Sequence, residues 1–289
     1  MTIQAGATIA DSASASPPRR RPGRPRAPRN LGISAYSIVV FAILLVPIVY
    51  TIVFSFNDVR RTNIVWRGFT LDNWLGICDI ERVCSAFGNS ILVGVTATIF
   101  AAAMGTAIAI ALVRYRFRFR NTLTILLFLP MATPELILGA SLSSQLVNMG
   151  FEKNLTTVII AHIMFCISFV VVTVRARVAS IDPALEEAGR DLYGSPFQVF
   201  LRITLPLLLP GIIAASLLSF ALSFDDFVIT NFVSGAAETL PKFIYTAASR
   251  SIPAQANVFA SAVFLLAIAI VVISQVSSGI RRRRLQREG

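Results

Sequence analysis

Residues 187–206 read Glu-Ala-Gly-Arg-Asp-Leu-Tyr-Gly-Ser-Pro-Phe-Gln-Val-Phe-Leu-Arg-Ile-Thr-Leu-Pro, a polar segment between two apolar stretches, 158–174 and 207–227. Each flanking stretch is long enough to cross a bilayer as a helix. The polar segment is therefore interpreted as a loop on one side of a membrane protein, and the rest of the chain can be placed outward from it.

Local signals in and before this segment predict two short helices joined by a tight turn. Asp182 can cap the first helix, and the proline that follows it suits a first helical position. Gly194 can end that helix in the left-handed conformation. Ser195, followed by Pro196 and then Gln198, has the spacing of a capping box for the second helix.

The composition places the whole chain in a membrane. It is 55% hydrophobic and 14% charged, with a mean hydropathy of +0.72. These values exclude an ordinary soluble domain and predict an all-α, polytopic membrane helix bundle of about six spans. The candidate spans are 35–54, 90–113, 123–147, 158–174, 207–227 and 258–276.

The basic residues predict the orientation. Of the 26 Lys and Arg residues, 19 lie in the two tails and in the loops on the same side as 187–206. Because basic residues favour the cytoplasmic side, both termini are predicted to be cytoplasmic. We expect a disordered basic tail at 1–30, a transmembrane domain at 31–280 with a cytoplasmic loop at 178–206, and a second basic tail at 281–289.

The net charge of +11 follows from this topology and favours contact with anionic membrane lipids, with no nucleic acid as a partner. The run Arg-Tyr-Arg-Phe-Arg-Phe-Arg at 114–120 lies between two spans, which favours an interfacial anchor over nucleic-acid binding.

Catalytic chemistry is poorly supported. Neither lysine, Lys153 or Lys242, has the glycine-rich context of a nucleotide-binding P-loop. The single histidine, His162, shares a helical face with Cys166, but two ligands do not make a metal site, so packing is the favoured role. No metal site and no cofactor are predicted in this chain.

Two other cysteines, Cys78 and Cys84, share the first outer loop. An oxidising periplasm permits a disulfide between them, and two free thiols are the alternative, because the sequence gives no geometry.

Three acids lie in or beside spans: Glu135, Asp225 and Asp226. Acids at membrane depth are costly and normally face a cavity or a partner. Pro130 and Pro134 should break the third span next to Glu135, as is tolerated where a helix lines a cavity. The three acids are candidate pathway residues that attract a cationic solute. The alternative is that they cap helices or pair with arginine.

The loop resembles the "EAA" loop of permease subunits of bacterial ABC importers, whose pattern is E-A-A, three residues, G, nine residues, I-x-L-P. Gly189 takes the second alanine place, and Tyr193 occupies the family glycine place, with Gly194 one position later. The resemblance implies a role in docking an ATPase for Glu187, Ala188, Gly189, Arg190, Asp191, Leu192, Gly194, Pro196, Ile203, Leu205 and Pro206.

Further stretches resemble the spermidine and putrescine permeases, the polyamine branch of this family. They are Leu129-Pro130-Met131 with Pro134-Glu135, the segment 160–177, and Ser-Phe-Asp-Asp-Phe-Val-Ile-Thr at 223–230. Together they extend over most of residues 30–280. The resemblance implies the type I ABC importer permease fold and uptake of a small cationic solute such as putrescine or spermidine across a bacterial inner membrane.

The resemblance also implies partners. They are a cytoplasmic ABC ATPase dimer that binds ATP and Mg, a second homologous permease subunit, and a periplasmic solute-binding protein. An ABC permease for another small solute, such as an amino acid derivative or opine, is the alternative. A secondary transporter or channel would need no docking loop, and an intramembrane enzyme would need clustered reactive groups.

Overall fold

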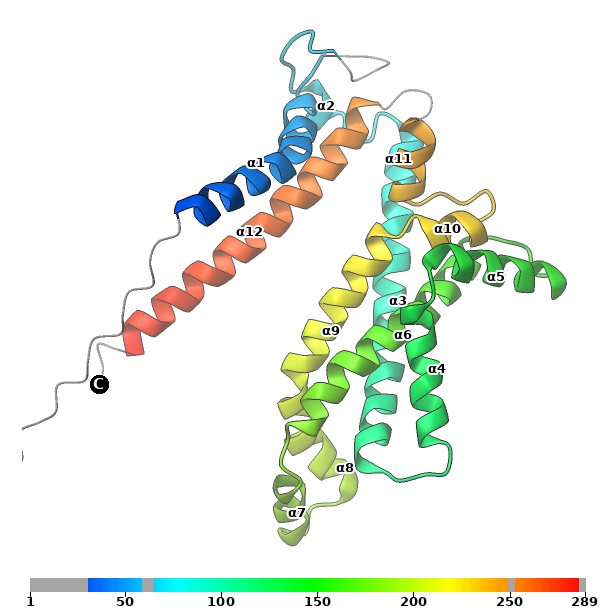
Figure 1. The fold of residues 1–289 in the computed structure, drawn as a ribbon, viewed down its shortest axis with the longest axis vertical. Coiled ribbons are helices and arrows are strands. Elements are labelled where there is room, and N and C mark those ends of the chain that lie inside the picture. The colour runs from blue at the N-terminus through cyan, green and yellow to red at the C-terminus, as the bar shows by residue number, and fades with distance from the viewer. Residues whose placement is uncertain (1–30, 59–64, 249–252, 286–289) are drawn as a thin grey trace, which may run out of the picture. The chain divides into compact units, whose positions relative to one another are not determined.

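The computed structural model describes residues 31–58, 65–248 and 253–285, so the tail predicted at 1–30 lies outside the described residues. Over the described part the chain is helical, and an isolated bridge between Asn57 and Phe69 is the only strand-like pairing there (Figure 1). The chain divides into two compact units, one up to Val46 and one from Pro47 onward. The division falls inside helix α1 (Leu31–Phe54).

Four helical segments of the described chain are long and apolar enough to cross a membrane: Gly32–Phe54 in α1, Glu81–Arg114 (α3), Leu155–Ala179 (α6) and Pro196–Asp225, which ends in α9 (Leu205–Asp225). They correspond to four of the six predicted spans. The sixth prediction falls in α12 (Ala254–Leu285), whose apolar part, Ala254–Ile270, is shorter. Helix α12 also continues into the segment predicted to be a basic tail, as far as Leu285.

The third predicted span, 123–147, is broken into two helices. It consists of α4 (Arg120–Ala132) and α5 (Glu135–Asn148), which meet at an angle of 108°. The predicted break is confirmed next to Pro134, whereas Pro130, which was also expected to break the span, lies inside α4. Thr133 has an extended backbone between the two helices, because a residue that precedes a proline, here Pro134, is disfavoured in helical conformation. The bend brings Glu135 to the start of a new helix instead of the middle of an old one.

Helices α3, α6 and α9 pack against one another and form the main core (Figure 1). On α3, a small residue recurs every four positions at Ala97, Ala101, Gly105 and Ala109, and all four are buried. Small side chains let membrane helices approach closely. At Gly105, an added Cβ would lie 2.6 Å from Cγ1 of Val170 on α6, so no larger residue fits there.

Short helices complete the described chain: α2 (Asp72–Leu75), α7 (Ala184–Asp191), α8 (Pro196–Val199), the π-helical segment η1 (Phe200–Thr204), α10 (Val228–Val233) and α11 (Leu240–Ala248). A second apolar cluster joins the start of α3 to α11 and α12 through Val83, Leu240, Phe243 and Phe259. The disulfide between Cys78 and Cys84 is present beside it, with the two Cα atoms 5.1 Å apart.

Candidate functional sites: a docking loop and an acidic cavity

The loop at 178–206 is built from capped helices, as its sequence indicates. Asp182 accepts a hydrogen bond from the backbone N–H of Ala184 at 2.9 Å, although the helix is assigned from Ala184 with Pro183 as its N-cap. Ser195 and Gln198 form the predicted capping box, with bonds of 3.3 and 3.0 Å. These contacts satisfy N–H groups that a helix start leaves unpaired.

The turn between the two helices corrects one prediction. The left-handed residue is Tyr193, with φ of +59°, and not Gly194. The N–H of Tyr193 donates to the carbonyl of Arg190, and that of Gly194 donates to the carbonyl of Gly189, which is the Schellman pattern of a helix end. Tyr193 thus adopts the glycine-like conformation at the place where the family pattern has glycine. At position 194 a glycine is required because the backbone approaches α7 closely there. A Cβ added at Gly194 would lie 2.7 Å from the Gly189 carbonyl oxygen.

The spacing of the motif has a packing explanation. Gly189 on α7 is buried, and a Cβ added there would lie 2.5 Å from Cδ1 of Ile203 and 3.3 Å from Cγ2 of Val199. The chain reverses through the turn, so the early and late parts of the motif touch. The first helix and the I-x-L-P tail therefore form one packed unit.

Pro206 explains the irregular helix before it. Proline has no N–H and its ring crowds the carbonyl four residues earlier, that of Arg202. The chain accommodates this with the π turn η1 at Phe200–Thr204, after which α9 continues as an α-helix. The loop and the membrane helix are thus continuous.

Two arginines connect the helices around the loop. Nη2 of Arg114, at the end of α3, lies 3.0 Å from Oε1 of Glu186 on α7, and both side chains are mostly buried. Nε of Arg177, on α6, donates to the carbonyl of Leu207 on α9 at 2.9 Å. The ion pair therefore links α7 directly to α3, which lies far from it in the sequence.

The outer side of the loop exposes apolar side chains to solvent. Tyr193 is 99% exposed, Leu192 82% and Phe197 71%, and Glu187 is also exposed. Exposed apolar patches of this kind mark surfaces for protein partners. We call Leu192, Tyr193 and Phe197 the docking face.

At another place in the fold, the three predicted pathway acids come together. Glu135, Asp225 and Asp226 all line one cavity of about 350 Å³, with apolar residues from α6, α9 and α10 completing the wall. Among the described residues, no lysine or arginine lines it. The sequence separates Glu135 from Asp225 by 90 positions, so only the fold places them around one space.

Asp226 is turned away from solvent and is fully bonded. Its Oδ2 lies 3.2 Å from Nε2 of His162 and accepts from the N–H and the hydroxyl of Thr230 at 2.9 and 3.0 Å. Its Oδ1 accepts from the N–H of Ile229 at 3.2 Å. His162 in turn lies 2.7 Å from the hydroxyl of Ser223 through Nδ1. Asp226 therefore caps α10 and joins it to α6, which is the alternative role that the sequence left open.

Glu135 and Asp225 are different. Both are exposed, and within the described residues neither has a hydrogen bond or an ion pair to a side chain. They are the acids in this cavity whose charge is available to a solute.

Asp225 also borders a second, larger cavity of about 830 Å³ between α9, α11 and α12. Its walls include the rings of Phe220, Phe224, Phe227 and Tyr245, and the last two stack with centroids 4.1 Å apart. A carboxylate beside aromatic faces is a favourable environment for an organic cation.

The segment between α10 and α11 is held by charged groups beside these cavities. Lys242 is buried and donates to the hydroxyl of Ser234 and to the carbonyls of Gly235 and Ala237. Burial lowers the pKa of the Lys242 ammonium, against the opposite influence of Glu238. Glu238 accepts two hydrogen bonds from Arg82, which hold the pKa of the Glu238 carboxyl below its usual range.

Sequence reasoning missed two features of these sites. The bonding of His162 to Asp226 joins residues 64 positions apart, and no local pattern announces it. The small-residue stripe on α3 was detectable from its spacing of four.

The fold is that of a multi-pass membrane protein, with four helical segments of the described chain long and apolar enough to cross a bilayer. The family profile described as "Binding-protein-dependent transport system inner membrane component" matches residues 101–287. The chain is 34% identical over 242 residues to the spermidine/putrescine transport system permease protein PotC of Escherichia coli K12, covering 83% of this chain and 91% of that protein. It is also 34% identical to the putrescine transport system permease protein PotI of the same strain, covering 80% of this chain and 84% of that protein.

Solved structures agree on the fold. A bacterial ABC transporter that imports the acidic polysaccharide alginate superposes with a TM-score of 0.63 at 19% identity, covering 89% of this chain and 99% of that one. The methionine transporter MetNI gives a TM-score of 0.53 at 17% identity, over 73% of this chain and 97% of that one. The chain belongs to the family of inner membrane components of binding-protein-dependent transport systems, and its fold is that of ABC importer permeases.

Proposed function

We propose that this chain forms, with a second homologous permease, the membrane pathway of an ATP-driven importer for small linear amines such as putrescine and spermidine. The observation that carries the substrate is the cavity lined by Glu135, Asp225 and Asp226, with no basic residue among its described walls. The PotC and PotI relatives, which are spermidine/putrescine and putrescine permeases, support the same class of solute.

The two cavities that share Asp225 fit the two parts of such a solute. An ammonium group is attracted by the available carboxylates, more strongly in a low-dielectric cleft than in bulk water. The polymethylene chain, and a second ammonium, suit the aromatic walls of the larger cavity. Sugars and anions lack both features.

We further propose that a periplasmic binding protein delivers the solute and that a cytoplasmic ATPase dimer, which holds ATP and Mg, binds the docking face. In this arrangement both termini and the loop at 178–206 are cytoplasmic. Closure of the ATPases on ATP would move α7, and the packed loop would pass that movement to α9 and, through Arg114 and Glu186, to α3. Such rigid-body switching links ATP and solute through one equilibrium.

The substrate is tested by uptake of labelled putrescine into proteoliposomes that contain the complete complex. Glu135→Gln and Asp225→Asn each remove a charge and keep the shape, so we expect KM to rise about tenfold with assembly unchanged, as for the loss of one charged contact. Competition should come from amines. If unlabelled sugars or anions compete and amines do not, the substrate assignment is wrong and the permease assignment stands.

The docking role is tested separately with Glu187→Lys. The change reverses an exposed charge in the first turn of α7, where a helix dipole favours an acid. We expect the ATPase to be lost from pull-downs and uptake to be abolished, while the chain still inserts in the membrane. Normal uptake by this variant would contradict the role.

A further inference from the structure

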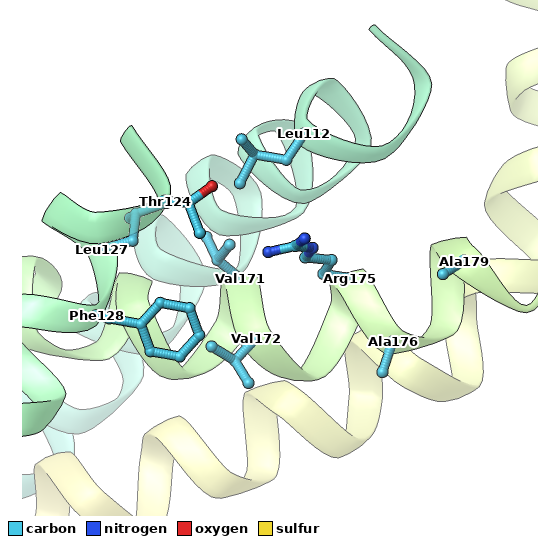
Figure 2. A pocket seen from close by; sticks show the side chains of 9 residues that line it. All are labelled: Leu112, Thr124, Leu127, Phe128, Val171, Val172, Arg175, Ala176 and Ala179. Atoms are coloured by element: carbon cyan, nitrogen blue, oxygen red, sulfur yellow. The ribbon is translucent and has the colours of Figure 1, made fainter. Parts of the chain in front are cut away.

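A smaller pocket lies where the end of α3, the start of α4 and the end of α6 meet. It has a volume of about 290 Å³ and is lined mainly by apolar side chains, including Leu127, Phe128 and Val172 (Figure 2). One charged side chain, Arg175, contributes to its wall, and Figure 2 shows it directed between α6 and the residues Leu112 and Thr124. No acidic residue of the described chain lines the pocket.

Arg175 differs from its neighbour on the same helix. Arg177 has a structural role, since it bonds to the carbonyl of Leu207 and packs against the backbone at Gly211. Arg175 is partly buried, yet among the described residues it has no hydrogen bond, ion pair or ring contact. A guanidinium that is partly removed from water and has no anionic partner is costly, so its position favours an external anion.

We propose that this pocket binds an anionic phospholipid of the inner leaflet, with Arg175 paired to the headgroup phosphate and an acyl chain against Phe128 and Val172. The depth in the membrane rests on the proposed orientation, in which these helix ends are cytoplasmic. Basic pockets between spans on that side are typical sites for anionic headgroups.

Charge and shape select this occupant over the others. A cationic solute is repelled by Arg175 and finds no carboxylate in the described wall. A small free anion would be attracted by Arg175 but gains nothing from the apolar lining. A phospholipid uses both.

The test is a titration of the purified full-length chain in mild detergent with phosphatidylglycerol or phosphatidylcholine, and bound lipid is counted by native mass spectrometry. We expect Arg175→Gln to raise the phosphatidylglycerol concentration for half occupancy about fivefold, the value of one basic residue near anionic lipid. Phosphatidylcholine has the same phosphate but an added choline cation, so it should bind more weakly and lose less affinity in Arg175→Gln. Arg175→Lys should keep most of the affinity for phosphatidylglycerol.

Two further variants separate the pocket from general surface charge. Arg116→Gln removes the same charge from an exposed position outside the pocket and should leave half occupancy unchanged. Ala176→Phe keeps Arg175 but fills the space beside it, and should weaken phosphatidylglycerol binding as Arg175→Gln does. Helix content and gel-filtration profile establish that each variant is folded.

If Arg175→Gln and Arg116→Gln lower the affinity for phosphatidylglycerol equally, the proposal is overturned, because binding would then depend only on surface charge. An unchanged affinity in Arg175→Gln would overturn it as well. If the assembled complex retains no phosphatidylglycerol and Ala176→Phe prevents association with the second permease, the pocket is a protein interface and the proposal is wrong. None of these readouts depends on which solute is transported. They also do not depend on the orientation of the chain in the membrane, which is tested separately by protease accessibility of the loop at 178–206.

Discussion

The docking loop and the acidic cavity are built in opposite ways. The loop exposes Tyr193 and Phe197 to solvent, and contacts within about 20 residues shape most of it. The cavity turns a carboxylate inward, and its wall comes from α5, α6, α9 and α10. Exposed apolar side chains such as Tyr193 and Phe197 indicate a contact with another protein, whereas a buried carboxylate must be hydrogen-bonded within this chain. The loop is therefore sensitive to changes on its surface, and the cavity to changes in its interior.

The largest effect should come from placing a charge on the docking face. Phe197→Asp removes an apolar contact from a side chain that is 71% exposed, so the chain itself should keep its stability while it loses the ATPase. We expect uptake to fall by more than about a hundredfold, with co-purification of the ATPase as the second readout. Leu75→Asp, at an 85% exposed leucine outside the docking face, is the matched control and should be near neutral. Retention of the ATPase by Phe197→Asp would place the docking face elsewhere.

Filling the tight contact at Gly189 inside the loop should have the next largest effect. Gly189→Leu forces a side chain against Ile203 and Val199, and overpacking of this kind costs about 1–3 kcal/mol. Uptake and thermal stability of the complex should both decrease.

A second substitution tests whether this contact is the cause. Ile203→Ala makes room, so the double variant should be more stable than Gly189→Leu alone. Additive losses in the double variant would show that the two parts of the motif do not act through this contact.

The interior of the cavity is tested with Asp226→Asn. The amide cannot accept at both of its positions, so one of the bonds to His162, Thr230 or the start of α10 is lost. We expect the free energy of unfolding to decrease by about 1–3 kcal/mol, measured by denaturant titration in detergent. Asp225→Asn, one residue away and exposed, should leave stability unchanged. Equal effects of the two substitutions would mean that the cavity does not distinguish them.

The smallest effect concerns the ion pair of Arg82 and Glu238, because Arg82 is 61% exposed. Glu238→Gln should cost at most about 1 kcal/mol at neutral pH. Since the pKa of Glu238 is lowered in the folded state, its contribution is present above the usual carboxyl pKa and is lost as pH falls through the lowered value. The Tm values of wild type and Glu238→Gln should converge as pH decreases across this acidic range. If the difference in Tm stays constant with pH, the ion pair with Arg82 is not the cause of that difference.

The sequence alone determined the features that depend on local chemistry. Hydropathy located the apolar segments because membrane helices must satisfy their own backbone. The capping box at Ser195 located the start of α8, and Asp182 lies one residue before the N-cap of α7. The family motif identified the loop, and Pro134 identified the break in the third span. Local rules failed by one residue at the turn, because glycine is the usual left-handed residue and Tyr193 adopts that conformation here.

Tertiary structure alone decided the direction of side chains and the meeting of distant ones. Asp225 and Asp226 are adjacent and chemically identical, yet one is exposed and the other is bonded to His162 on another helix. The bend of 108° after α4, whose size no local rule gives, brings Glu135 to the same cavity. Burial and hydrogen-bond partners depend on how helices pack, and that packing depends on contacts between residues far apart in the chain. The sequence could therefore name the acids, and only the fold could assign their roles.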